Sequence, residues 1–147
     1  MHVLSSTLLF GTGIGSAFYL LTTTLTRDVR AIATVARMVV IADWLFTATT
    51  VVFQPLSGLY MLHLSHLPLS APWLTWSVWL YAIAVACWIP VVWIQIRLRD
   101  LAIASAEKGV SLPAAYWRYF YVWIALGIPA FFGFIAVFYL MVVKLTP

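Results

Sequence analysis

Four long apolar stretches, separated by short polar segments, are the feature of this sequence that most constrains its fold. They cover about residues 3–25, 35–62, 74–96 and 116–143. Because a helix rises 1.5 Å per residue, roughly 20 apolar residues are enough to cross the hydrocarbon of a bilayer. The sequence therefore predicts an all-α polytopic membrane protein, with four transmembrane helices in an antiparallel bundle that forms a single domain over residues 1–147.

Composition supports the same fold class and narrows the partners. Of the 147 residues, 65% are hydrophobic and only 8% are charged, and the mean hydropathy is +1.04. A chain with so few charged residues has to use the lipid bilayer as its solvent. The formal net charge of +4 does not indicate a nucleic-acid partner, because the basic residues lie where helices are expected to meet the cytoplasm.

The basic residues also predict the orientation in the membrane. Two loops, at about 26–34 and 97–115, hold or adjoin most of them, whereas the segment between the second and third stretches has none. They are Arg27, Arg30, Arg97, Arg99, Lys108 and Arg118. Since Lys and Arg are enriched in cytoplasmic loops, both termini are expected on the outer side. The third helix is expected to continue past its apolar stretch until Gly109 ends it.

Polar residues within the second stretch recur at helical spacing and form one stripe. They are Asp43, Thr47, Thr50, Gln54 and Ser57, and Met61 continues the same spacing. A stripe of this kind is expected to face the bundle interior. It is typical either of a lining for a cofactor, a substrate or a proton path, or of helix contacts in which hydroxyls bond to their own backbone. Pro55 is expected to bend this helix.

Asp43 is the most informative of these residues, because an ionised carboxylate inside a bilayer costs several kcal/mol unless it is paired. Arg37 lies on the same helix, but the six-residue offset puts it on a different face. Gln95 and two arginines, Arg97 and Arg118, lie nearer the right depth on the other helices. Two readings stay open: a structural ion pair or hydrogen-bonded anchor, and a carboxylate that carries a proton.

The histidines are expected to share the outer face of the membrane. His2 begins the first helix, and His63 and His66 follow the second. Imidazoles from two neighbouring helices can hold a haem iron from both sides, which makes His2 and His63 candidate axial ligands. A regular helix, however, turns His63 by about 180° away from Gln54. Both histidines can equally be interfacial residues without a ligand.

Two further features are ambiguous in the same way. Lys144, also on the outer side, either pairs with a haem propionate or extends its ammonium group to water. Gly11 and Gly15, in G-x-x-x-G spacing on the first helix, allow either a neighbouring helix or a flat cofactor to approach closely.

Long parts of the chain resemble a known family. The segments HVLSSTLLFGTGIGSAF, ARMVVIADWLFTATTVVFQPLSGLYMLH, YAIAVACWIPVVWIQIRLRDLA and WIALGIPAFFGFIAVFYLMV are similar to a bacterial family of predicted integral membrane proteins of undefined function, the DUF2269 family. More distantly, the order of His-Val-Leu, a glycine-containing helix, a basic residue and Ser-Gly-Leu-Tyr resembles HemJ-type protoporphyrinogen oxidases, the membrane part of bacterial urate oxidase and CopD-type copper proteins.

These resemblances imply a bacterial cytoplasmic (inner) membrane protein with haem b near the outer face, serving electron transfer or an oxidase-like redox step. His2 matches the leading histidine of the distant families, and Arg37 takes roughly the place of their basic residue. The chain lacks the HemJ lysine of the third helix, which puts porphyrinogen oxidation in doubt. Two alternatives are a cofactor-free accessory subunit of a membrane complex and a small homo-oligomeric proton-coupled transporter that uses Asp43. Whether the protein is an enzyme stays open.

Overall fold

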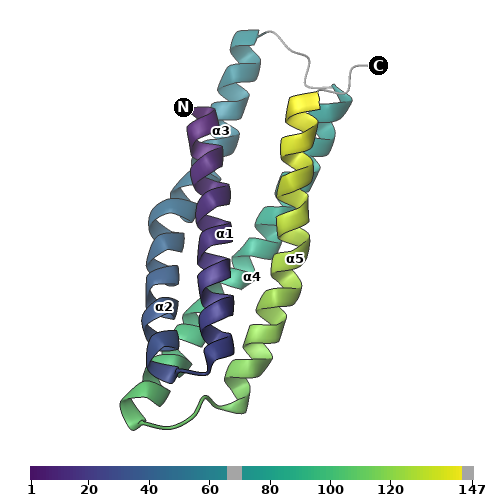
Figure 1. Ribbon diagram of the computed structural model, residues 1–147. Helices are drawn as coiled ribbons and strands as arrows, with labels where there is room; N and C mark the ends of the chain where they lie inside the picture. Colours follow the sequence, from purple (N-terminus) through teal and green to yellow (C-terminus); the bar gives the residue numbers. More distant parts are fainter. Residues whose placement is uncertain (66–70, 144–147) are drawn as a thin grey trace.

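The computed structural model describes residues 1–65 and 71–143, and within these ranges every element is helical. Figure 1 shows helices running up and down along one axis, with the start of the first helix and the end of the last described helix at the same end of the molecule. The helices are α1 (His2–Thr26), α2 (Val29–Ala42), the π-helix η1 (Asp43–Thr47), α3 (Ala48–Ser65), α4 (Pro72–Lys108) and α5 (Ala114–Val143). The predicted all-α class is confirmed.

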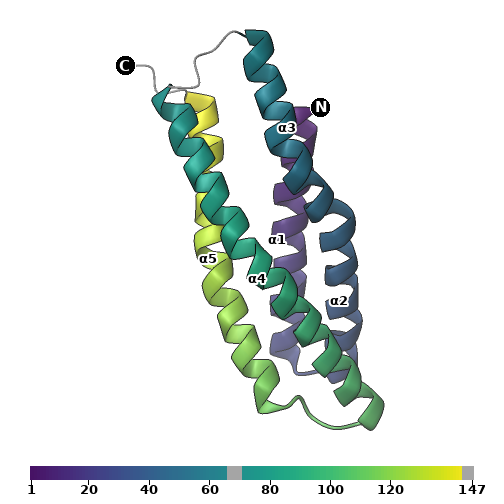
Figure 2. The same ribbon diagram turned by 180° about the vertical axis from the view of Figure 1, so that it is seen from behind.

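The elements α2, η1 and α3 follow one another without a break and form one helix of 37 residues from Val29 to Ser65. Counted this way, four helices of the described ranges are long and apolar enough to cross a membrane, as the sequence predicts. Their exposed surface is largely apolar, as lipid contact requires. Figure 2 shows the long helix lying beside α1 and α4 lying beside α5.

Helix ends explain where the observed bounds differ from the apolar stretches. The second helix begins at Val29 rather than near residue 35, because the Asp28 carboxylate accepts hydrogen bonds from the Arg30 and Ala31 amides and caps it. Helix α4 continues beyond its apolar stretch to Lys108. Gly109, with φ of 64°, ends it in the left-handed conformation, as the sequence predicts.

The irregular part of the second helix lies at η1, before Pro55. Here the Ala48 amide donates to the Asp43 carbonyl, one residue further back than in an α-helix. The chain bends between α2 and α3 in Figure 1. Sequence analysis attributed the bend to Pro55, which does lie inside α3, but did not find the π-helix. Such single-turn insertions occur frequently at functional sites.

A buried apolar cluster fills the half of the bundle near the two short connections at 27–28 and 109–113. We call it the apolar plug. Its buried members are Leu20, Ile32, Ala33, Ala36, Val39, Val91, Ile94, Leu98, Ala102, Tyr116, Phe120 and Trp123. Within it, the hydroxyls of Thr24 and Tyr116 lie 2.9 Å apart and join α1 to α5. This half of the bundle is therefore built mainly of buried apolar side chains, with few polar groups among them.

Candidate functional site

Asp43, the first residue of η1, lies inside the bundle with 4% of its surface exposed. Its Oδ1 accepts a hydrogen bond of 3.0 Å from the Thr47 hydroxyl. Its Oδ2 is buried and has no hydrogen-bond partner among the described residues. A buried carboxyl oxygen without a partner is costly whenever the group is ionised, so Oδ2 is a position where a proton or a hydrogen-bond donor would be stabilised.

A central cavity of about 150 Å³ adjoins Asp43 and Thr47. Gln95 and Trp88 of α4 also line it, and the Gln95 Oε1 and Trp88 Nε1 atoms are buried and unpartnered within the described part of the chain. Most of the remaining wall consists of aliphatic, aromatic and small residues of α1 and α5, Gly13 among them, and valines of α3 and α4 complete it. The cavity thus brings together a carboxyl, an amide and an indole N–H, each of which can form a further hydrogen bond.

None of the ion pairs considered for Asp43 is present. Arg37 is exposed on α2, and Arg118 is exposed on α5. The Arg97 guanidinium lies over the Trp93 ring, 5.2 Å from its centroid. In the described ranges the salt bridge found joins Arg99 to its neighbour Asp100. Of the predicted candidates, only Gln95 reaches the Asp43 cavity. The structural role considered for Asp43 was an ion pair or a hydrogen-bonded anchor, and in the described residues its carboxylate has a hydrogen bond from Thr47 but no ion pair.

His2 lies against α3 and is held by two side chains of the predicted stripe. Its Nδ1 is 2.8 Å from the Ser57 hydroxyl, and its Nε2 is 3.2 Å from the Gln54 amide nitrogen. Because the Ser57 hydroxyl donates to the Phe53 carbonyl, it accepts from His2 Nδ1–H. The Nε2 lone pair then accepts from the Gln54 amide. Gln54 Oε1 is buried without a partner in the described ranges.

The structure does not bring His63 to His2. Helix α3 continues without interruption through His63, which is exposed and points away from the face that carries Gln54. Met61, at the outer end of the stripe, is 49% exposed, because α3 extends beyond the first turn of α1 (Figure 1). His66 and Lys144 lie outside the described residues. Across residues 1–65 and 71–143, no three His, Cys, Asp or Glu side chains gather as a metal site.

The inner part of the predicted stripe is buried. Asp43, Thr47, Thr50 and Gln54 are each at most 8% exposed, and Ser57 is half-buried beside His2. We refer to these five residues as the polar stripe. At 1.5 Å per residue, the fourteen residue steps from Asp43 to Ser57 cover about 21 Å of the roughly 30 Å hydrocarbon thickness. Beyond Asp43, on the other side, lies the apolar plug.

The family described as "Predicted integral membrane protein (DUF2269)" matches residues 1–145. The chain belongs to this family. The match covers all of the described helices and every residue of the polar stripe. No curated protein and no solved structure matches the chain. The more distant resemblances to HemJ-type, CopD-type and urate oxidase membrane domains stay predictions.

The glycines of this DUF2269 protein separate into two kinds. A Cβ at Gly58 would lie 3.3 Å from His2 Cε1, closer than most such contacts, whereas a Cβ at Gly11, Gly13 or Gly15 would meet nothing within 4 Å. The G-x-x-x-G face is therefore not in close helix contact within this chain. Gly58, which sequence analysis did not single out, is the glycine that lets the His2 ring approach α3.

Replacing Gly58 with alanine is expected to displace the His2 ring and weaken its bonds to Ser57 and Gln54. In protein labelled with ¹⁵N-histidine, both ring nitrogen resonances of His2 should shift. Gly15→Ala, also within a helix but without neighbours at the added methyl group, should leave them in place. Unchanged His2 signals in Gly58→Ala, or equal shifts in both variants, would contradict this geometry.

Proposed function

We propose that this protein couples proton binding to a membrane transport step, and that Asp43 carries the proton. The observation that supports this most strongly is a buried carboxyl in a cavity inside the bundle, with one oxygen unpartnered and no cation paired to it in the described residues. Ionisable groups inside membranes are rare, and they mark proton relays and substrate pathways. Protonation removes the charge of Asp43 and makes Oδ2 a donor for an acceptor in the cavity.

The polar stripe supplies a route for protons between Asp43 and the end of the bundle where His2 lies. The hydroxyls of Thr50 and Ser57 donate to carbonyls of their own helix, which leaves their oxygens able to accept a further hydrogen bond. Gln54 lies between them along the helix, and its Oε1 is a hydrogen-bond acceptor without a partner in the described residues. Each step along this route is about one helical turn, a distance that one or two water molecules bridge.

The apolar plug supports coupling rather than free conduction. Buried residues of the apolar plug lie between Asp43 and the basic end, and the buried polar side chains of that half are few: Thr24 and Tyr116, whose hydroxyls are paired, and Ser105. A proton that reaches Asp43 therefore waits there until the bundle rearranges or a substrate binds. Because the cavity measures only about 150 Å³, we propose that a transport path forms between copies in a homo-oligomer.

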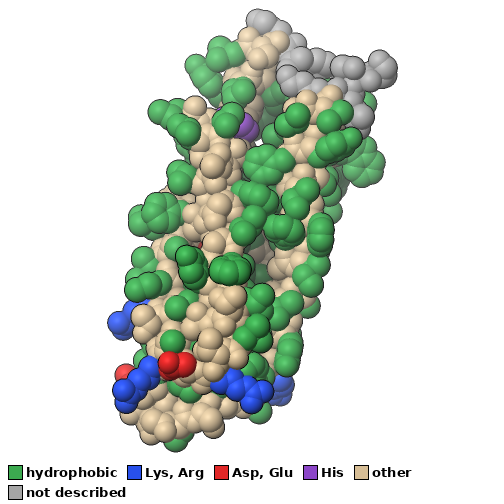
Figure 3. All heavy atoms as spheres, in the orientation of Figure 1, with side chains coloured by type: hydrophobic (Ala, Val, Ile, Leu, Met, Phe, Trp, Pro, Cys, Tyr) green, Lys and Arg blue, Asp and Glu red, His purple; other side chains and the backbone are tan. Residues whose placement is uncertain are grey.

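The orientation follows from charge. Figure 3 shows Lys and Arg side chains gathered at one end of the molecule, while its flank is covered by hydrophobic side chains. Because cytoplasmic loops carry the excess of Lys and Arg, we propose that this end faces the cytoplasm in a bacterial inner membrane. Both termini, and the His2 end of the polar stripe, then lie on the outer side, from which protons are driven inward.

A pH step tests the proposal without knowledge of the substrate. On protein in a solid-supported membrane, protons that move from the His2 end to Asp43 cross part of the membrane and give a transient current. Asp43→Asn should abolish this current. Asp28→Asn, the same change in an exposed residue at the start of α2, should keep it, because asparagine also caps a helix. A current of wild-type size in Asp43→Asn would reject Asp43 as the proton carrier.

A second candidate function is haem binding by His2, for electron transfer or another redox step. The observation that favours it is the His2–Ser57 contact of 2.8 Å, since iron-ligating histidines have their other ring nitrogen held by such a partner. His2 would present Nε2 to the iron once the Gln54 amide moved aside. His63 does not fit the second axial position, so His2 would be the protein ligand from the described ranges, and the haem would supply the electron-accepting centre.

A reduced-minus-oxidised spectrum decides on the haem. Protein from haem-replete cells should show a Soret and an α band, which His2→Ala removes and His63→Ala leaves unchanged. Absence of both bands in folded wild-type protein would reject haem binding by His2 and would leave the role proposed for Asp43 unaffected.

A further inference from the structure

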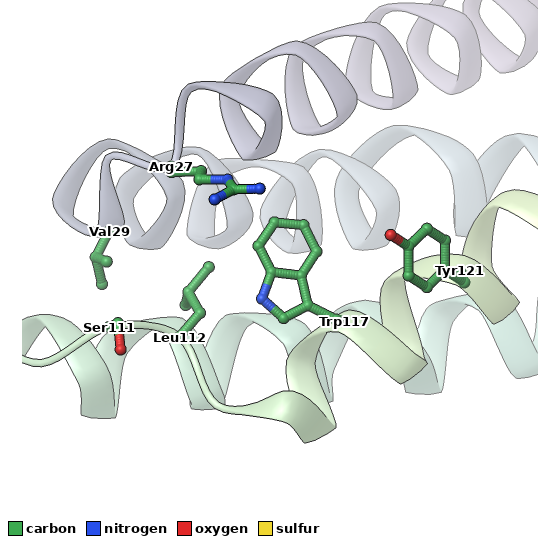
Figure 4. Close-up of a pocket in the computed structure, with 6 residues that line it drawn as sticks. All are labelled: Arg27, Val29, Ser111, Leu112, Trp117 and Tyr121. Atoms are coloured by element: carbon green, nitrogen blue, oxygen red, sulfur yellow. The ribbon is translucent and has the colours of Figure 1, made fainter.

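A second hollow, of about 370 Å³, lies at the basic end of the bundle and is separate from the Asp43 cavity. Its walls come from the turn between α1 and α2, from the first residue of α2, from the segment that leads into α5 and from the first two turns of α5. Figure 4 shows the side chains that line it: Arg27, Val29, Ser111, Leu112, Trp117 and Tyr121. No part of the proton route reaches this hollow, so its role has to be sought separately.

Arg27 supplies the charge of the hollow. It occupies the left-handed conformation that ends α1, with φ of 61°, and its guanidinium lies 5.9 Å from the centroid of the Trp117 ring. The adjacent carboxylate, Asp28, accepts from two backbone amides at the start of α2. In the described part of the chain no carboxylate forms a salt bridge with Arg27. Its donors are therefore available to an anion.

The other walls are suited to a molecule that is polar at one end and apolar at the other. The Ser111 hydroxyl and the Tyr121 ring lie on either side of Trp117 in Figure 4, and Val29 and Leu112 give apolar surface. Trp and Tyr are the residues that prefer the level of lipid head groups. Tyr121, one turn beyond Trp117 along α5, is 65% exposed and continues the wall of the hollow toward the membrane interior.

We propose that this hollow binds the phosphate of an anionic phospholipid, with Arg27 as the phosphate ligand and the acyl chains along α1 and α5. Basic pockets between transmembrane helices at the membrane surface take anionic head groups in this way. An inorganic phosphate ion offers the same charge but gains nothing from the apolar wall. The lipid source is therefore favoured over the free ion.

Native mass spectrometry of the detergent-solubilised protein tests the proposal. Dioleoylphosphatidylglycerol, dioleoylphosphatidylcholine and inorganic phosphate are each titrated against three proteins: wild type, Arg27→Gln and Arg30→Gln. Wild type should bind phosphatidylglycerol in preference to phosphatidylcholine. Arg27→Gln should bind phosphatidylglycerol about tenfold more weakly, the loss expected for one charge-assisted contact. Arg30→Gln carries the same charge change at the same end but outside the hollow, and should match wild type.

Three results would overturn the proposal. Equal binding of the two lipids would remove the role of the negative charge. Equal loss in both arginine variants would show general attraction rather than a site. Inorganic phosphate that binds as well as phosphatidylglycerol would assign the hollow to a free anion. Ser111→Ala provides a second, milder variant, and it should weaken phosphatidylglycerol binding less than Arg27→Gln does.

Discussion

Replacing Leu98 with asparagine is expected to make lipid vesicles that contain this protein leak protons. Leu98 is fully buried in the apolar plug, and it lies three residues from Gln95, toward the basic end of α4. An amide at this position places a polar group directly beyond the Asp43 cavity, where wild type has only apolar atoms. A dye inside the vesicles, read after a potential is imposed, should report a leak about tenfold or more above wild type, which corresponds to a barrier lowered by about 1.4 kcal/mol.

Two further variants make this leak diagnostic. Ile89 lies on the same helix but is 62% exposed toward lipid. Vesicles with Ile89→Asn should leak protons no faster than wild type, because the added amide lies away from the route. Adding Asp43→Asn to Leu98→Asn should remove the leak, since protons then lose their last carrier before the plug. A leak that persists in the double variant would show that protons bypass Asp43.

Replacing Gln54 with leucine is expected to slow proton binding more than any other change in the polar stripe outside Asp43. Gln54 is 8% exposed, contacts His2 and lies one turn from Thr50. Leucine has a similar size, so it fills the same space while removing the polar groups that join the two ends of the route. In the pH-step experiment, the rate of the transient current should fall about tenfold or more.

Thr49→Val is the matched change outside the stripe. Thr49 is exposed on the lipid side, and its hydroxyl donates to backbone carbonyls of its own helix. Its loss should leave the rate unaltered, because the side chain takes no part in the route. If Gln54→Leu kept the wild-type rate, protons would have to reach Asp43 by water from another direction.

The membrane fold could be predicted from the sequence because a bilayer leaves few alternatives. Backbone groups in hydrocarbon have to be satisfied within each segment, so apolar runs of this length become helices. The sequence predicted the helix bounds less well, since they depend on single local contacts. Composition alone assigns the polar Asp28 to a loop, yet its carboxylate caps the start of a helix there. Gly109 gave a clearer signal, and α4 ends where it predicts.

The candidate site could be predicted only in part. Helical spacing placed Asp43 and Gln54 on one interior face, and depth placed Gln95 near Asp43, because spacing and depth are properties of each helix. Pairing between helices depends on rotation, which the apolar pattern does not define. Depth therefore indicates Arg97 and Arg118 as well as Gln95, whereas the Arg97 guanidinium lies over Trp93 and Arg118 is exposed. Trp88 was missed, because an indole N–H gives no signal among so many aromatic residues.

Infrared spectroscopy of the protein in a lipid bilayer tests the proton-carrying role of Asp43 most directly. The chain has only 4 acidic side chains, and Asp43 is the one buried inside the bundle. The difference spectrum between acidic and alkaline buffer should contain the C=O stretch of a protonated carboxyl in apolar surroundings, and this band should be absent from Asp43→Asn. A spectrum in which Asp43→Asn and wild type show the same carboxyl bands would contradict the account.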